Sequence, residues 1–174
     1  TILDAQGTGR VIYITGASSI AALIENLHIV GGSADEGAGV YLGDNAAATL
    51  QNNVLYHNVA GEDGGGVYAA EGASTVLRHN TIYSNSASYG GGVYVEAGGE
   101  IDLTSSILAS NAGGGIYAEA GADCNLGYND FYANSPNDYA GSVAAAATDI
   151  SAPPGLADPG AYDFHLALSS PAVN

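Results

Sequence analysis

The feature that most constrains the fold of this chain is an internal repeat with a period in the twenties. Short segments recur in which an aliphatic residue precedes a tyrosine, and these tyrosines stand 28, 27, 26 and 23 residues apart. We call them the tyrosine column: Tyr13, Tyr41, Tyr68, Tyr94 and Tyr117. Leucines downstream keep the steps of 27, 26 and 23: Leu50, Leu77, Leu103 and Leu126. A period shared by two sets of residues indicates one structural unit per repeat.

A third set of recurring positions is polar. Its members are Asn53, Asn80, Ser106 and Asn129, each followed five residues later by Asn58, Asn85, Asn111 and Asn134. The runs between them are short and bounded by Gly, Asn, Asp and Ser, and none holds a long apolar stripe of helical period. Each repeat therefore predicts one coil of a β-helix, in which stacked Asn amides bond to one another and to the turn backbone.

The predicted fold class is all-β, a single-stranded, right-handed parallel β-helix (β-solenoid) of about five to six coils, each 23–28 residues long. The hand follows from the strong preference of parallel crossovers for right-handed connections. Alternation along the strands places Val40, Val67 and Val93 in the core and the tyrosine column outside it. We expect the coils over residues 1–134 and a looped closing segment of the same domain over residues 135–174.

The charge balance narrows the classes of partner. The chain has two basic residues, Arg10 and Arg78, against 18 acidic ones, which gives a formal net charge of −16. Such a chain repels nucleic acid and anionic membranes, and its apolar runs are too short for membrane insertion. Cations and neutral glycans remain compatible partners. The single cysteine, Cys124, excludes an internal disulfide.

An outward tyrosine column would offer a sugar chain an aromatic surface, with acidic side chains beside it as hydrogen-bond acceptors. The candidate glycan-binding residues are Tyr41, Tyr68, Tyr94, Tyr117, Glu71, Glu96 and Glu119. The alternative interpretation is that like residues stack only because such ladders stabilise a solenoid. A polysaccharide or cell-surface glycan is the partner that the first interpretation predicts.

Two carboxylate pairs suggest a metal site. Asp35 and Glu36 precede Glu62 and Asp63 by one repeat of 27 residues, so the pairs should lie on adjacent coils. Four negative charges within about 5 to 8 Å repel one another unless a cation or a proton intervenes. Oxygen-only ligands on a loop suit calcium, although a solvated acidic loop would explain the same residues. We expect no required cofactor, with calcium as the candidate ion.

The repeats also carry a resemblance to known proteins. A Gly-Gly-aliphatic entry such as Gly91-Gly92-Val93, with Phe131 and Asn134 spaced as Phe-x-x-Asn, resembles the repeats of polymorphic outer-membrane proteins and related pectin-lyase-like β-helices. The tail around residues 153–159 is similar to the closing segment of many bacterial β-helix domains, and residues 1–9 resemble an early coil. The resemblance implies an exported, extracellular or cell-surface protein that extends upstream.

These observations predict a structural or adhesive module of a secreted or cell-surface protein. The first alternative is a polysaccharide lyase or glycoside hydrolase acting on acidic polysaccharide, but an anionic substrate needs more positive charge than two arginines supply. We assign no catalytic residue. The second alternative is end-to-end self-association, because the coil ends of a β-helix expose unpaired strand edges.

Overall fold

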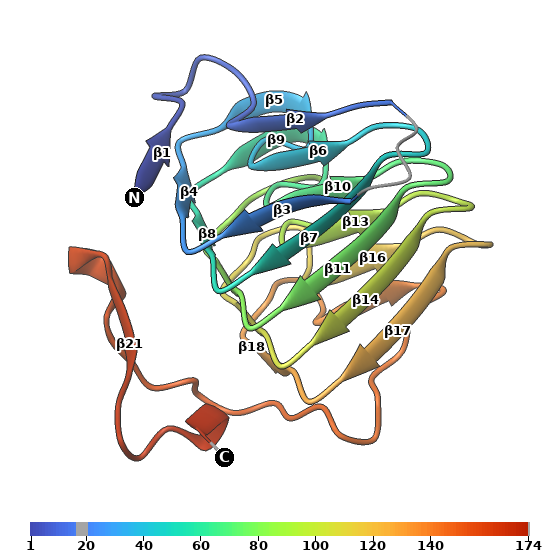
Figure 1. Ribbon diagram of the computed structural model, residues 1–174. Helices are drawn as coiled ribbons and strands as arrows, with labels where there is room; N and C mark the ends of the chain where they lie inside the picture. Colours follow the sequence, from blue (N-terminus) through green and yellow to red (C-terminus); the bar gives the residue numbers. More distant parts are fainter. Residues whose placement is uncertain (17–20, 174) are drawn as a thin grey trace.

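The computed structural model describes residues 1–16 and 21–173 as a β-solenoid built on three parallel sheets (Figure 1). Sheet A contains β1 (Ile2–Asp4), β4 (His28–Val30), β8 (Val54–Tyr56), β12 (Thr81–Tyr83), β15 (Ile107–Ala109) and β18 (Asp130–Tyr132). Sheet B contains β2 (Ile12–Ile14), β6 (Val40–Leu42), β10 (Val67–Ala69), β13 (Val93–Val95), β16 (Ile116–Ala118) and β19 (Tyr139–Gly141). Sheet C contains β3 (Ala22–Glu25), β7 (Ala47–Gln51), β11 (Ser74–Arg78), β14 (Glu100–Thr104) and β17 (Asp123–Gly127).

The strand register agrees with the sequence repeat. Tyr68 lies opposite Tyr41 on one side and Tyr94 on the other. Leu77 is likewise paired with Leu50 and Leu103 in sheet C. Since each strand pairs with the equivalent strand of the next coil, the predicted parallel β-solenoid is confirmed.

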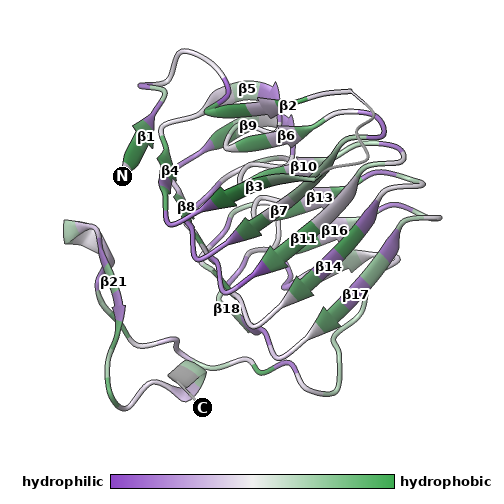
Figure 2. Ribbon diagram, in the orientation of Figure 1, coloured by the Kyte–Doolittle hydropathy of each residue, from purple (hydrophilic) through white to green (hydrophobic). Residues whose placement is uncertain are grey.

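Aliphatic side chains fill the inside of the solenoid. Most residues flanking the tyrosine column, such as Val67 and Val93, are fully buried, as are Leu50, Leu77 and Leu103. Figure 2 shows hydrophobic residues concentrated on the strands and hydrophilic ones at many of the turns. Stacking equivalent coils therefore gives one continuous core along the axis.

Two asparagine ladders hold the turns at either end of each sheet A strand. Asn85 illustrates them, since its Nδ2 donates to the Leu55 carbonyl at 3.0 Å and its Oδ1 accepts from the Asn58 backbone N–H at 3.0 Å. Nδ2 of Asn85 also donates to Oδ1 of Asn111 at 3.2 Å. These buried amides satisfy backbone groups that would otherwise be unpaired, as predicted.

The residue before each ladder position adopts a left-handed backbone conformation, which the sequence pattern did not predict. The positive φ angles at the turn between sheets C and A are 54° at Asn52, 54° at His79, 49° at Ser105 and 59° at Tyr128. At the far end of sheet A they are 52° at His57, 52° at Ser84, 58° at Ser110 and 54° at Ala133. A single left-handed residue thus turns the chain sharply from one sheet to the next within one or two residues.

The chain beyond residue 134 still follows the solenoid before it turns away. β19 pairs with β16, and Ile150 forms a bridge to Asp130 at the edge of β18. Residues 151–173, which we call the C-terminal arm, contain the antiparallel strands β20 (Leu156–Asp158) and β21 (Asp163–Leu166), and the short 3-10 helices η1 (Pro159–Ala161) and η2 (Pro171–Val173).

The C-terminal arm packs on the outer face of sheet A. The Phe164 ring lies 4.9 Å from the Tyr56 ring, 5.8 Å from Tyr83 and 6.1 Å from His28, measured between centroids. Tyr162 adds a second contact to Tyr56 at 5.4 Å. This cover explains why Tyr56, which points away from the solenoid interior, is only 2% exposed.

The N-terminal end of the solenoid is formed by the first strand of each sheet: β1, β2 and β3. Large side chains of the first strands of all three sheets are well exposed there: Ile2, Tyr13 and Leu23. Its unpaired strand edges are where the predicted end-to-end association would occur. Within the described residues, no helix is both long enough and apolar enough to cross a membrane.

Candidate functional site

The tyrosine column is not the open aromatic surface that the sequence suggested. Adjacent rings stack face to face with centroids 5.0–5.3 Å apart, so each ring face is covered by the next ring. Tyr68 and Tyr94 are each only 5% exposed. A Cβ built at Gly37 would lie 2.8 Å from the Cβ of Tyr41, and one built at Gly64 would lie 2.8 Å from the Cβ of Tyr68. The backbone at these glycines therefore packs directly on the tyrosine column. The expected exposed tyrosine face is therefore wrong for Tyr68 and Tyr94, while Tyr13 at the end of the column is well exposed.

The glutamates beside the column hydrogen-bond to the protein itself. The Tyr94 hydroxyl donates to Oε1 of Glu119 at 2.6 Å, and the Ala97 N–H donates to Oε2 of Glu119 at 3.1 Å. The Glu71 N–H donates to Oε2 of Glu96 at 3.0 Å. Burial first, and the Glu119 hydrogen bond next, raises the pKa of Tyr94. The column, Glu96 and Glu119 thus form a hydrogen-bonded layer, while the side chain of Glu71 is exposed. Glycan binding by these residues stays a prediction.

Arg10 lies against the end of the tyrosine column nearest the N-terminus. Its guanidinium carbon is 4.5 Å from the Tyr41 ring centroid and 5.6 Å from that of Tyr13. Its Nε donates to the backbone carbonyl of Glu36 at 2.8 Å. One of the two basic side chains of the chain therefore joins the tyrosine column to the neighbouring acidic loop.

The two predicted carboxylate pairs lie on neighbouring strands of adjacent coils, β5 (Ser33–Glu36) and β9 (Val59–Asp63). Glu36 is opposite Asp63 and both are half-buried, while Asp35 and Glu62 are exposed. A register shift between the two strands interrupts their regular alternation at these residues. Among the described residues no group of three or more His, Cys, Asp or Glu could hold a metal, and calcium binding stays a prediction.

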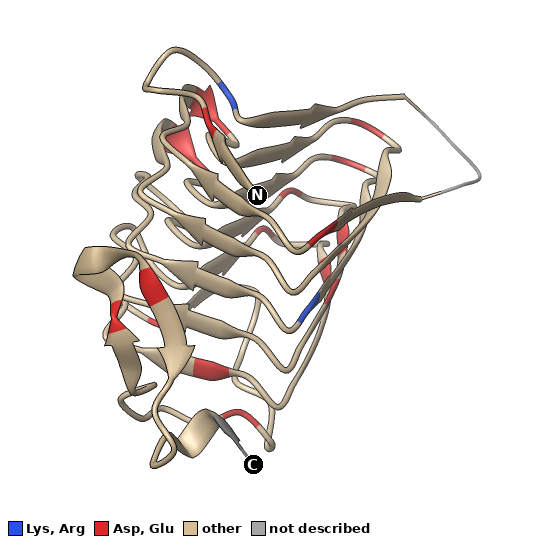
Figure 3. Cartoon of the chain, turned by 60° about the vertical axis from the view of Figure 1, so that its left-hand side comes forward, with Lys and Arg blue, Asp and Glu red and all other residues tan. Residues whose placement is uncertain are grey.

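The Glu36–Asp63 pair is nevertheless electrostatically unusual. Burial first, then Glu36, Glu62 and Glu119, raises the pKa of Asp63 to about 6. Burial also raises the pKa of Glu36, against the opposing effect of Arg10. Oδ1 of Asp63 is buried and has no hydrogen-bond partner among the residues that the structure describes. Figure 3 shows the other acidic residues spread along the solenoid and the C-terminal arm.

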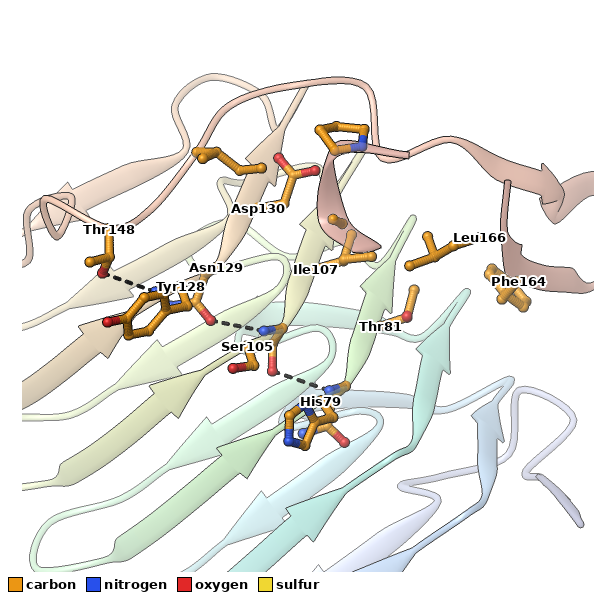
Figure 4. Close-up of a pocket in the computed structure, with 15 residues that line it drawn as sticks. His79, Thr81, Ser105, Ile107, Tyr128, Asn129, Asp130, Thr148, Phe164 and Leu166 are labelled. Atoms are coloured by element: carbon orange, nitrogen blue, oxygen red, sulfur yellow. Dashed lines mark hydrogen bonds between the residues drawn. The ribbon is translucent and has the colours of Figure 1, made fainter. Parts of the chain in front are cut away.

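A groove that the sequence did not predict lies where the C-terminal arm meets the turns between sheets C and A (Figure 4). Its volume is about 590 Å³. One wall consists of the turns of three successive coils, at residues 79–81, 105–107 and 128–130. The other wall comprises Thr148, Ile150, Phe164, Leu166, Pro171 and Ala172. We call it the arm groove.

Tyr128 is the most exposed aromatic residue of the arm groove, with 73% of its surface accessible. It occupies the left-handed turn position that Asn52, His79 and Ser105 occupy in the preceding coils. Its backbone N–H donates to the Thr148 hydroxyl at 3.1 Å, which fixes the turn without constraining the ring. Because a turn side chain projects from the solenoid, each coil can present a different group there.

Asp130 is the buried ionisable residue of the arm groove. It begins β18 at the outward position that Ile2, His28, Val54, Thr81 and Ile107 occupy in the earlier coils, and only 2% of it is exposed. Its Oδ1 accepts from the Ala152 N–H at 3.1 Å, while Oδ2 has no partner within the described residues. Burial raises the pKa of Asp130. A carboxylate in a column that otherwise holds no acidic residue was the sequence signal for this site.

Comparison with known proteins identifies a family. No curated protein and no solved structure matches the chain. A family model described as the right-handed beta helix region matches residues 5–151, which is most of the chain. The three parallel sheets and the equivalent residues stacked from coil to coil agree with that description. The chain therefore belongs to the right-handed β-helix family.

Proposed function

We propose that the chain is a rigid adhesive module of a secreted or cell-surface protein, which holds a neutral glycan on its side. The observation that carries the proposal is the arm groove, where an exposed aromatic ring, several hydroxyl groups and a buried carboxylate meet. Pockets that combine apolar walls with a few placed polar groups are the usual binding sites of small ligands. The stacked coils behind the groove keep these groups in fixed positions.

The charge of the module supports a neutral glycan over an acidic one. With a net charge of −16, the surface repels uronate-rich or sulfated polymers at moderate salt concentration. Arg78, the basic residue beside the groove-lining His79, forms a salt bridge with Asp102 at 3.3 Å on sheet C. The proposed extracellular location rests on the resemblance of the repeats to those of exported β-helices.

The test is to incubate the 174-residue protein with insoluble polysaccharides, both neutral (cellulose, chitin, mannan) and acidic (pectate, alginate). Depletion of the protein from the supernatant measures retention, and mass spectrometry of the supernatant detects released oligosaccharides. We expect retention on at least one neutral polymer, none on the acidic ones, and no release above a heat-inactivated control. Release would favour the lyase or hydrolase alternative, and the absence of retention on every neutral polymer would contradict the proposal.

A further inference from the structure

We infer that the arm groove binds a neutral saccharide unit, with Oδ2 of Asp130 accepting a hydrogen bond from a sugar hydroxyl and the Tyr128 ring packing on the sugar's C–H face. The inference rests on the proposed adhesive function and specifies the contacts by which the arm groove would hold the sugar. Figure 4 shows both residues beside the turns that line the groove.

Asp130 supplies the strongest reason to expect a ligand. A buried carboxylate oxygen without a hydrogen-bond donor is costly, because it has lost its hydration and gained nothing in return. In the preceding coils the same position holds Ile107, Thr81 and Val54, so the fold itself does not require an acid there. The Ala152 N–H satisfies only one of the two carboxylate oxygens. Oδ2 is closed to solvent in this structure, so a ligand hydroxyl would supply the missing donor after a small turn of the carboxyl toward the groove.

The remaining polar groups favour a ligand that both donates and accepts hydrogen bonds. The hydroxyls of Thr81 and Ser105 line the groove, and neither takes part in a hydrogen bond within the described residues. A sugar hydroxyl can donate to Asp130 and also accept from such groups, whereas an ammonium group can use them only as acceptors and leaves their O–H donors unpaired. An anionic ligand would bring a second negative charge next to Asp130. The set of groups thus fits a polyol better than an amine or an acid.

The dimensions of the groove fit a short stretch of a glycan. Its volume of about 590 Å³ lies within the usual range for small-ligand pockets. Turns of three successive coils span about 10 Å at the interstrand spacing, which corresponds to about two sugar rings. Phe164, Leu166 and Pro171 of the C-terminal arm provide apolar surface for the C–H groups on the opposite side.

The experiment is isothermal titration of the whole chain with neutral disaccharides of gluco, galacto and manno configuration, and with 1,5-diaminopentane as the amine probe. Asp130→Asn removes the charge and keeps an acceptor for the Ala152 N–H, while Tyr128→Asn installs the residue that stands at this turn position in an earlier coil, Asn52. We expect each substitution to weaken saccharide binding about tenfold. The matched control is Tyr89→Ala, which removes a 56% exposed tyrosine beside the tyrosine column and should leave the affinity unchanged.

The outcomes separate this inference from the proposed function. If no disaccharide binds, or if only the diamine does, the inference is overturned. Saccharide binding that survives both groove substitutions but is lost in Tyr89→Ala contradicts the assignment of the binding site to the arm groove. Such a result would not contradict the adhesive function. Groove-dependent binding of a free disaccharide, without retention on any insoluble polymer, supports the inference and contradicts the adhesive function. Thermal melting of each variant shows that a lost affinity does not reflect an unfolded protein.

Discussion

At the scale of single residues, the turns beside sheet A carry most of the local strain. Side chains with a Cβ avoid the left-handed region, at a cost of about 1 kcal/mol or more, while Asn and Gly tolerate it. Ala133 has φ of 54° and no polar side chain that could compensate by bonding to the nearby backbone. The left-handed turn at Ala133 is therefore maintained by packing of the neighbouring residues and not by a hydrogen bond from its own side chain.

Replacing Ala133 with glycine should stabilise the protein by about 0.5 to 1 kcal/mol, since relief of the strained backbone outweighs the added freedom of the unfolded chain. Urea unfolding followed by circular dichroism measures this change. Ala112→Gly is the matched control, because Ala112 is not among the residues with positive φ, and the substitution should destabilise by about the same amount. Equal destabilisation by both substitutions would show that the turn at Ala133 carries no strain.

The half-buried Asp63 makes the stability of the solenoid depend on pH. Its pKa of about 6 in the folded protein lies above the ordinary value of 3.8, so folding favours the protonated form. This contribution to stability is complete below about pH 3.8 and is lost as the pH rises through about 6. Asp63→Asn should therefore stabilise the protein at pH 7.5 by about 1 kcal/mol, allowing for solvent screening, and flatten the pH profile.

Urea unfolding between pH 4.5 and 7.5 tests this prediction. Asp123→Asn is the control because Asp123 is an exposed carboxylate on β17, and its substitution should leave the slope of the profile almost unchanged. If wild type and Asp63→Asn show parallel profiles, the raised pKa of Asp63 does not contribute to folding.

At the scale of the strands and ladders, the first asparagine ladder has a gap at Ser106. Asn80 and Asn129 in the same ladder donate through Nδ2 to the carbonyls of Leu50 and Leu103, at 2.8 and 2.9 Å. Ser106 donates to the local Thr104 carbonyl instead, so the ladder lacks the equivalent bond to the coil before it. An asparagine at this position has the reach to supply both that bond and an acceptor for Nδ2 of Asn80.

Ser106→Asn should therefore raise the free energy of unfolding by about 1 kcal/mol, the usual net value of a buried hydrogen bond. The midpoint of urea unfolding measures it, with Ser151→Asn on the exposed start of the C-terminal arm as the control. A lower midpoint for Ser106→Asn would mean that the space around residue 106 is too small for the larger amide side chain. The ladder would then gain no stability from an asparagine at this position.

The strand register could be predicted from the sequence because equal side chains stack directly on one another. The steps of 27 and 26 residues between Leu50, Leu77 and Leu103 correspond to observed strand pairs. The exposure of the tyrosine column could not be predicted in this way, because it depends on how closely the next loop returns, as at Gly64. The same limit applies to Glu36 and Asp63, whose side of the strand follows from a register shift between β5 and β9.

At the scale of the whole molecule, the arm groove depends on a contact between distant parts of the chain. Phe164 reaches Tyr56, Tyr83 and His28, which belong to three different coils. No repeat relates the C-terminal arm to the coils, so the sequence predicted a closing segment without showing which face it would cover. The outward Tyr56 and Tyr83 on adjacent strands were the only indication that sheet A needs a cover.

Phe164→Ala should release the C-terminal arm while the coils stay folded, because Phe164 provides three of the ring contacts that join β21 to sheet A. Hydrogen exchange followed by mass spectrometry should show the amides of β20 and β21 exchanging about tenfold faster, with those of β11 and β14 unchanged. Leu168→Ala, at a fully exposed position of the same arm, should change neither. Since the arm forms one wall of the arm groove, the same substitution should also weaken saccharide binding there. Unchanged exchange in β20 and β21 would mean that the arm is held by hydrogen bonds, such as that from the Ala152 N–H to the Asp130 carboxylate, and not by the aromatic cluster.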